Sequence, residues 1–256
     1  DRRQRQMCIR DRGMELPAAC RTAALLGLSV ALFRPQTAST IEDMTREGID
    51  MVLAMDLSAS MLSRDFRPNR LESAKDVAMD FVDSRPFDRI GVIAYEGEAF
   101  TQVPITSDHI VVKNGISTLE TGQLQGGTAI GTGLAVAVNR LRESKAASKV
   151  IVLLTDGENN AGQIEPMDAA QLAKLNNIRV YTIGVGTVGK AKSPVAILPN
   201  GQYKYDWVDV RIDEDVLQGM ASLTGARYFR ATNADKLKEI YREIDTLEKT
   251  KFNVLK

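Results

Sequence analysis

From about residue 48 onward, the chain alternates short apolar runs with longer amphipathic stretches. Continuous apolar runs, such as MVLAM before Asp56 and VIVLL before Thr155, are typical of strands buried on both faces of a parallel sheet. On this basis we predict strands over residues 50–56, 89–95, 99–103, 149–154, 178–185 and 226–230.

Between these strands, apolar residues recur at the three-to-four-residue spacing of amphipathic helices. The first such helix starts at a capping box formed by Asn69 and Glu72 and ends before Pro86. We expect the long segment 186–210 to be irregular, with a hairpin turn at Pro199–Gly201. The other predicted helices cover residues 108–119, about 130–144, 166–176, 213–223 and about 235–248.

The order of these elements predicts the fold class. Too few residues separate strands 89–95 and 99–103 for a parallel crossover, so these two strands must form an antiparallel hairpin. The other strands alternate with helices, which is typical of a parallel sheet. We therefore predict an α/β domain with a doubly wound, mostly parallel six-stranded sheet, one antiparallel edge strand and helices on both faces.

The sequence before residue 48 does not share this pattern. Its apolar run, Ala23–Phe33, is shorter than the roughly 20 residues that span a bilayer. The basic residues at the start have no periodicity, and we exclude them from the fold. The predicted organisation is a non-native or unstructured segment (1–14), a truncated membrane anchor or signal-like helix (15–36), a linker (37–47), the folded domain (48–250) and a tail (251–256).

Composition narrows the chemistry that is open to the folded domain. Lys and Arg total 33, and Asp and Glu total 33, so no net charge attracts the chain to nucleic acid. The only cysteines, Cys8 and Cys20, precede the domain, and His109 is the only histidine. These counts exclude a cysteine-based or multi-histidine metal site in the domain and leave oxygen atoms as metal ligands.

Oxygen-bearing side chains follow the first predicted strand directly. Asp56, Ser58 and Ser60 lie at the carboxyl end of this strand, where open parallel sheets bind their ligands. One carboxylate and two hydroxyls within five residues suit Mg²⁺, Mn²⁺ or Ca²⁺ better than zinc, which prefers nitrogen and sulfur. The alternative is a turn in which these side chains satisfy backbone groups and bind no ion.

A second aspartate, Asp156, follows the predicted strand 149–154. If the two strands are neighbours, both carboxylates face one crevice, where they repel each other unless a proton or a cation lies between them. Thr128 follows two glycines that allow close approach of the backbone, and it supplies a third hydroxyl. The predicted metal ligands are Asp56, Ser58, Ser60, Thr128 and Asp156.

Three motifs in this order, D-L-S-A-S, G-G-T-A-I-G and L-L-T-D-G, resemble the von Willebrand factor type A domain and its metal-ion-dependent adhesion site (MIDAS). The resemblance covers roughly residues 48–250. A narrower resemblance is to the membrane-anchored bacterial Bat proteins, the aerotolerance-associated BatA/BatB-like group. It is carried by Arg34-Pro35-Gln36, by Pro68-Asn69-Arg70-Leu71, by T-D-G-E-N-N-A-G from Thr155 and by Y-T-I-G-V-G from Tyr181.

The resemblance implies roles for the predicted ligands. Ser58 and Ser60 would bind the ion directly, and Thr128 would do so in one state of its loop. Asp56 and Asp156 would bind it directly or through water. One position is then left open for an Asp or Glu of a partner protein. The implied ion is Mg²⁺ or Mn²⁺, with Ca²⁺ less favoured.

The resemblance also implies a cellular setting. The domain would be a non-enzymatic module on the periplasmic side of a bacterial inner membrane, attached through its N-terminal helix. A MoxR-type AAA+ ATPase and other Bat proteins are the implied members of the same system.

Loops around the site would form the partner-binding rim, with Met61 and Leu62 exposed for apolar contact. The predicted rim residues are Met61, Leu62, Glu96, Gln125, Glu158 and Asn159.

Two alternatives to a metal-dependent binding module stay open at this point. The first is a metal-dependent hydrolase or phosphatase on the same type of sheet. A haloacid-dehalogenase-type site would need a second aspartate two residues after Asp56, where Ser58 stands, and no P-loop motif is found. The second alternative is a metal-free structural scaffold domain.

Overall fold

The computed structural model describes residues 20–26, 28, 48–124, 126–199 and 201–254. The chain divides into two units, residues 1–44 and 45–256. In the first unit, residues 20–26 are helical and exposed. Residue 28 is also described, and the remainder of the expected anchor and the linker lies outside the described residues. Within the described ranges, no helix is both long enough and apolar enough to cross a membrane.

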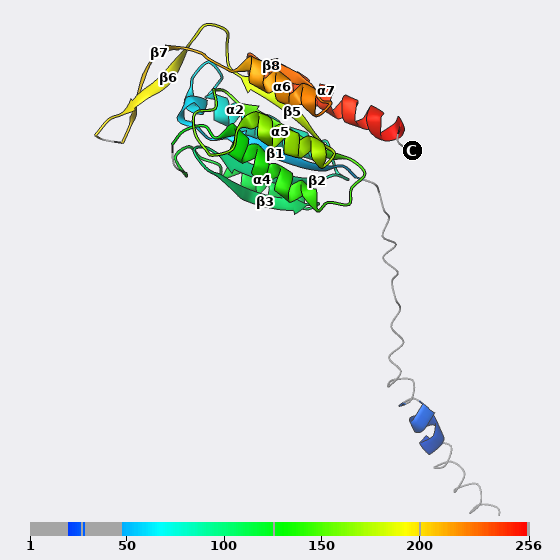
Figure 1. Ribbon diagram of the computed structural model, residues 1–256. Coiled ribbons are helices and arrows are strands. Elements are labelled where there is room, and N and C mark those ends of the chain that lie inside the picture. Colours follow the sequence, from blue (N-terminus) through cyan, green and yellow to red (C-terminus); the bar gives the residue numbers. More distant parts are fainter. Residues whose placement is uncertain (1–19, 27, 29–47, 125, 200, 255–256) are drawn as a thin grey trace, which may run out of the picture. The chain divides into compact units, whose positions relative to one another are not determined.

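The second unit is built on a six-stranded sheet with the strand order β3-β2-β1-β4-β5-β8 (Figure 1). All neighbouring strands are parallel except β2 and β3, which are antiparallel, so β3 is the antiparallel edge strand. The predicted fold class is therefore confirmed. The strands are β1 (Asp50–Asp56), β2 (Arg89–Tyr95), β3 (Ala99–Thr106), β4 (Lys149–Thr155), β5 (Ile178–Val185) and β8 (Tyr228–Ala231).

Helices cover both faces of this sheet and bury two separate apolar clusters. One cluster contains the apolar sides of α2, α3 and α7, and the other contains those of α4, α5 and α6. Successive β1 side chains enter opposite clusters, Met51 and Leu53 the first and Val52 the second, which explains the unbroken apolar run. The helices are η1 (Ala59–Leu62), α2 (Arg70–Asp83), α3 (His109–Ser117), α4 (Ile130–Arg142), α5 (Pro166–Leu175), α6 (Glu214–Leu223) and α7 (Ala234–Val254).

Two predictions about the later part of the chain were wrong. Residues 186–210 are not irregular, because they contain β6 (Lys190–Ile197) and β7 (Tyr203–Asp209), which form a separate antiparallel two-stranded sheet. The expected turn lies between these two strands, where Leu198 N–H donates to the Gln202 carbonyl at 2.8 Å. Helix α7 continues past the expected end at 248 to Val254.

Glycines in α4 determine how closely this helix packs. A Cβ atom at Gly131 would lie 1.9 Å from the carbonyl oxygen of Ile164, and one at Gly133 would lie 2.7 Å from the ring of Tyr95. Both distances are far below van der Waals contact. The glycine-rich stretch therefore brings α4 against β2 and against the segment that leads into α5.

We expect Gly131→Ala to destabilise the protein by about 3 kcal/mol, near the upper end for overpacking, because the added methyl group meets a backbone carbonyl. Gly126→Ala is the matched control, since nothing lies within 4 Å of its Cβ position. Urea unfolding of both variants measures the difference. Equal midpoints for the two variants would contradict this account of α4 packing.

Candidate metal centre

The candidate site lies where two adjacent parallel strands end. β1 and β4 are hydrogen-bonded neighbours, and Asp56 is the last residue of β1, whereas Asp156 directly follows β4. After β1 the chain continues into α2 on one face of the sheet, and it enters β4 from α4 on the other face. Such a topological switch point is where open α/β sheets bind ligands. The expected proximity of the two strand ends is confirmed.

Hydrogen bonds join four of the predicted ligands into one cluster. The Ser58 and Ser60 hydroxyl oxygens are 3.0 Å apart, and the Ser60 hydroxyl donates to Asp156 Oδ1 at 2.6 Å. The Ser58 backbone N–H donates to Asp56 Oδ1 at 2.8 Å. The loop thus folds back so that both serine side chains bridge the ends of β1 and β4.

Thr128, the fifth predicted ligand, lies beside this cluster and is almost fully buried. Its backbone N–H donates to Asn160 Oδ1 at 2.8 Å, and its carbonyl accepts from the Asn160 N–H at 3.0 Å. Its hydroxyl oxygen is 3.9 Å from the Cβ position of Gly157, the residue after Asp156. The loop that follows β4 therefore fixes Thr128 at the same edge of the sheet.

Arg70 is the main site residue to which the sequence analysis gave no role. It is the first residue of α2, it is buried, and its Nη1 donates to Asp156 Oδ2 at 2.8 Å. Its Nε and Nη2 donate to Asp65 at 2.8 and 2.7 Å. The side chain thus makes a bidentate contact with Asp65 and a third contact with Asp156. The sequence offered only its place in the Pro68–Leu71 motif as a signal.

The two aspartates of the site have different electrostatic surroundings. Burial, and then the charge of Asp156, raise the pKa of Asp56 to about 7. Burial also raises the pKa of Asp156, but the positive charge of Arg70 opposes this effect. Asp56 accepts hydrogen bonds from the neutral Ser58 amide and from the Thr155 hydroxyl, the latter at 2.7 Å. Among the described residues, no cation forms an ion pair with Asp56.

The donor set fits a hard divalent cation. Every polar side-chain atom that Asp56, Ser58, Ser60 and Asp156 offer is oxygen, and a charged Asp56 is costly to bury without a cation nearby. In the part of the chain that the structure describes, no group of three or more His, Cys, Asp or Glu side chains is placed to hold a metal ion. A cation at this site would therefore need hydroxyl oxygens beside the two carboxylates.

The predicted rim residues differ in how far their side chains are exposed. Met61 is fully buried, so the expectation that it is exposed was wrong, because η1 turns its side chain into the core. Leu62 is only partly buried. Glu96 is also buried, and it accepts a hydrogen bond from the Gly122 N–H at 3.3 Å. The other predicted rim residues are Glu158, which is exposed, Asn159, which is partly buried, and Gln125, which lies outside the described residues.

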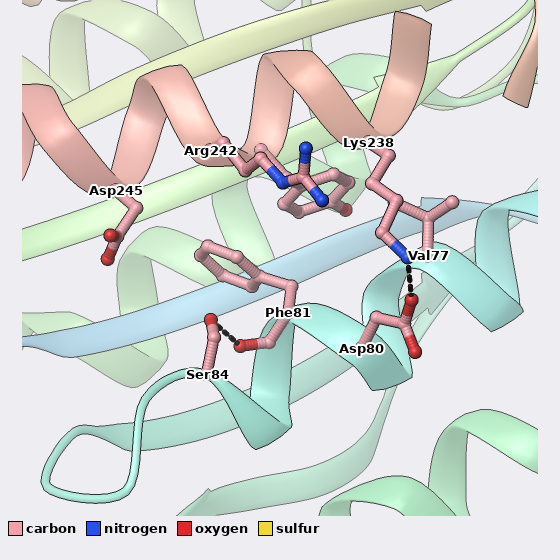
Figure 2. A pocket seen from close by; sticks show the side chains of 8 residues that line it. Val77, Asp80, Phe81, Ser84, Lys238, Arg242 and Asp245 are labelled. Carbon is pink, nitrogen blue, oxygen red and sulfur yellow. Dashed lines mark hydrogen bonds and ion pairs between the residues drawn. The ribbon is translucent and has the colours of Figure 1, made fainter. Parts of the chain in front are cut away.

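A separate hollow of about 310 Å³ lies between α2 and α7 (Figure 2). Figure 2 shows Lys238 of α7 bonded to Asp80 of α2, with Phe81 beside them. Helix α2 begins at Arg70, beside the candidate metal centre at the carboxyl ends of the strands. Its last turns therefore lie toward the amino ends of the strands. This hollow is therefore not part of the candidate site.

Comparisons with known proteins identify the family. A family model described as the von Willebrand factor type A domain matches residues 51–158. BatB from Bacteroides thetaiotaomicron, described as a conserved hypothetical protein, has a TM-score of 0.69 and 32% identity, over 79% of this chain and 100% of that chain. The chain therefore belongs to the von Willebrand factor type A domain family, and its similarity to BatB bears out the narrower resemblance to the Bat group.

Three further proteins extend the comparison. An aerotolerance-related membrane protein from Bacteroides fragilis NCTC 9343, carrying multiple mutations to serines, has a TM-score of 0.66 and 31% identity, over 77% of this chain and 98% of that chain. Proximal thread matrix protein 1 from the mussel byssus, with a zinc-occupied MIDAS motif, shares the fold at a TM-score of 0.61 and 24% identity, over 78% of this chain and 46% of that chain. An uncharacterized protein from Borreliella burgdorferi is 30% identical over 183 residues, which is 71% of this chain and 53% of that protein. The chain thus spans about half the length of this last relative.

We expect Asp56→Asn to stabilise the ion-free protein at about pH 8. The pKa of Asp56 is about 7 in the folded state, against 3.8 as its ordinary value, so the native state binds the extra proton between these values. Stability of the ion-free wild type should therefore fall as the pH rises through this range, and the neutral amide removes that loss. Thermal unfolding in EDTA at about pH 5 and pH 8 measures the effect.

The matched control for this measurement is Asp76→Asn, which changes an exposed aspartate on α2. Its pH dependence should follow that of the wild type. If the unfolding midpoint of Asp56→Asn also equals that of the wild type at both pH values, the charge on Asp56 does not destabilise the ion-free fold.

Proposed function

We propose that the domain is a metal-ion-dependent protein-binding module that holds a divalent cation and binds a carboxylate of a partner protein through it. The observation that carries this proposal is the buried Asp56, which has neutral donors around it and lies beside two serine hydroxyls and a second aspartate. A divalent cation at this place would compensate the charge on Asp56. The match of the chain to the von Willebrand factor type A domain and its similarity to BatB support a role in protein interaction.

Each predicted ligand would contribute an oxygen atom to the ion. Ser58 and Ser60 would bind through their hydroxyls, and Asp56 and Asp156 would bind directly or through water. Thr128 would supply a further hydroxyl from the neighbouring loop. Because Arg70 already neutralises much of Asp156, the bound ion would keep part of its positive charge, and it would supply the Lewis acidity that attracts a partner's Asp or Glu.

The proposed ion is Mg²⁺ or Mn²⁺, with Ca²⁺ less favoured, since small hard cations suit a compact set of hydroxyl and carboxylate ligands. The zinc-occupied MIDAS motif of the mussel protein belongs to a structure that shares the fold. It supports the general capacity of this fold to hold a divalent cation at the motif.

We propose no catalytic role for the site. Domains of this family are generally interaction modules rather than enzymes. The residue two positions after Asp56 is Ser58, so the second acid of a haloacid-dehalogenase-type phosphatase is missing. The Ser58 and Ser60 hydroxyls pair with each other and the Ser60 hydroxyl donates to Asp156, an arrangement that would suit ligands rather than a nucleophile.

The proposed setting follows the relatives. One similar structure is described as an aerotolerance-related membrane protein. We propose that this chain is likewise part of a membrane-anchored Bat-type protein, with its domain on the periplasmic side of a bacterial inner membrane. Other Bat proteins and a MoxR-type ATPase would act in the same system.

Millimolar Mg²⁺ or Mn²⁺ should raise the thermal unfolding midpoint of the wild type relative to EDTA. Binding to the native state alone stabilises it by about 2.7 kcal/mol once the free ion is at about 100 times its dissociation constant. Ser58→Ala should stay folded but lose this gain, whereas Ser117→Ala, at an exposed serine on α3, should keep it. Calorimetric titration measures the ion affinity of each variant.

An unchanged midpoint for the wild type, with no heat of ion binding, would rule out the metal-dependent function in favour of the metal-free scaffold. Hydrolysis of a phosphoester by the wild type that disappears in Asp56→Asn would instead place the domain among the metal-dependent hydrolases.

A further inference from the structure

The β6–β7 hairpin exposes large apolar side chains. It forms a two-stranded sheet of its own and projects from the end of β5, beyond the six-stranded sheet (Figure 1). Its exposed apolar residues include Val195, Ile197, Trp207 and Val208, of which Val195 is 47% exposed. Isolated two-stranded sheets are marginally stable, and apolar patches of this kind mark binding surfaces in soluble domains.

The hairpin contacts the segment that follows β1 and carries Ser58 and Ser60. Just after η1, the Arg64 N–H donates to the Lys192 carbonyl of β6 at 3.0 Å, and the hydroxyl oxygens of Ser63 and Ser193 are 2.7 Å apart. The Arg64 guanidinium lies 4.0 Å from the centre of the Tyr205 ring of β7. These contacts fix the position of the hairpin relative to Ser60.

The hairpin lines two hollows, and Pro194 and Val195 contribute to both. The first, of about 550 Å³, is also lined by Ser60, Asp156 and Arg211. This places a hairpin surface with apolar side chains directly beside the candidate metal centre. Arg70 and Arg211 line this hollow together with Asp156 and Asp209, so the charges of its side chains balance. The cation of the proposed function would make the hollow positive, which suits an acidic partner.

The second hollow, of about 390 Å³, is lined by Ile197 of the hairpin, by Ala59 of η1 and by Glu96. Glu96 follows β2 and Asp156 follows β4, and these strands lie on opposite sides of β1. The hairpin therefore has apolar side chains on both sides of the loop that carries Ser58 and Ser60, here called the serine loop.

We propose that the hairpin and the serine loop form one groove for an extended segment of a partner protein. The segment would place an Asp or Glu at the metal and a large apolar side chain in each hollow. In an extended chain, residues two positions apart point the same way and are about 6.6 Å apart, so the expected pattern is apolar-x-acidic-x-apolar. This inference rests on the proposed function, because the acidic residue needs the bound ion.

The test uses the full chain and synthetic peptides with the cores Leu-Ser-Asp-Ser-Leu and Ser-Ser-Asp-Ser-Ser. Binding is followed by fluorescence anisotropy in Mg²⁺ and in EDTA. The leucine peptide should bind the wild type about tenfold more tightly than the serine peptide in Mg²⁺, because it buries apolar side chains against the hairpin. EDTA, or Asn in place of the peptide's Asp, should abolish this binding.

Two valine variants test the role of the hairpin. Val195→Ser should reduce the preference for leucine several-fold and leave the Mg²⁺ affinity and the serine-peptide affinity unchanged. Val111→Ser is the matched control, because Val111 is also 47% exposed but lies on α3, away from both hollows. It should change none of these affinities.

Each contrary outcome has a separate meaning. Equal, EDTA-sensitive binding of both peptides would overturn the groove and leave the proposed function standing, whereas no binding of either peptide in Mg²⁺ would overturn both. A leucine preference that survives EDTA would make the hairpin an independent apolar site and overturn the groove. Sedimentation of a wild-type dimer that Val195→Ser dissociates would show that a second copy of the chain occupies this surface, which also overturns the proposal.

Discussion

The candidate site depends on the cost of burying two carboxylates at the ends of adjacent parallel strands. Asp56 and Asp156 are both buried, and the two strands that carry them are held in register by the sheet. The fold compensates one charge with Arg70 and leaves the other with hydroxyl and amide donors. This difference between the two carboxylates is the physical basis of the proposed metal-dependent function.

The sheet and most of the site could be predicted because their signals are local. The apolar run of β1 reflects burial on both faces, and Asn69 caps α2 as expected, since its side chain accepts the Glu72 N–H at 2.8 Å. The Asp56–Ser60 motif lies on one continuous loop. The pairing with Asp156 required only that β1 and β4 be neighbours, and the order of strands and helices made that arrangement natural.

The features that were missed depend on tertiary contacts. The burial of Met61 follows from the direction in which a single turn of 3₁₀ helix faces the core. The contact between Arg70 and Asp156 joins residues that are 86 positions apart. The hairpin strands were not predicted because most of their side chains stay exposed, so they lack the apolar pattern that burial imposes on β1.

A line of hydrogen bonds runs from the candidate metal centre to the root of the hairpin. Asp156 accepts from Arg70, Arg70 also donates to Asp65, and Asp65 accepts from the Thr187 N–H at 2.9 Å, just before β6 begins. Thermodynamic linkage makes any coupling along this line reciprocal. Suppose that an ion bound to Asp156 weakens the contact between Arg70 and Asp65 and thereby changes the affinity of the hairpin for a partner. Binding of that partner would then change the affinity of the site for the ion by the same factor.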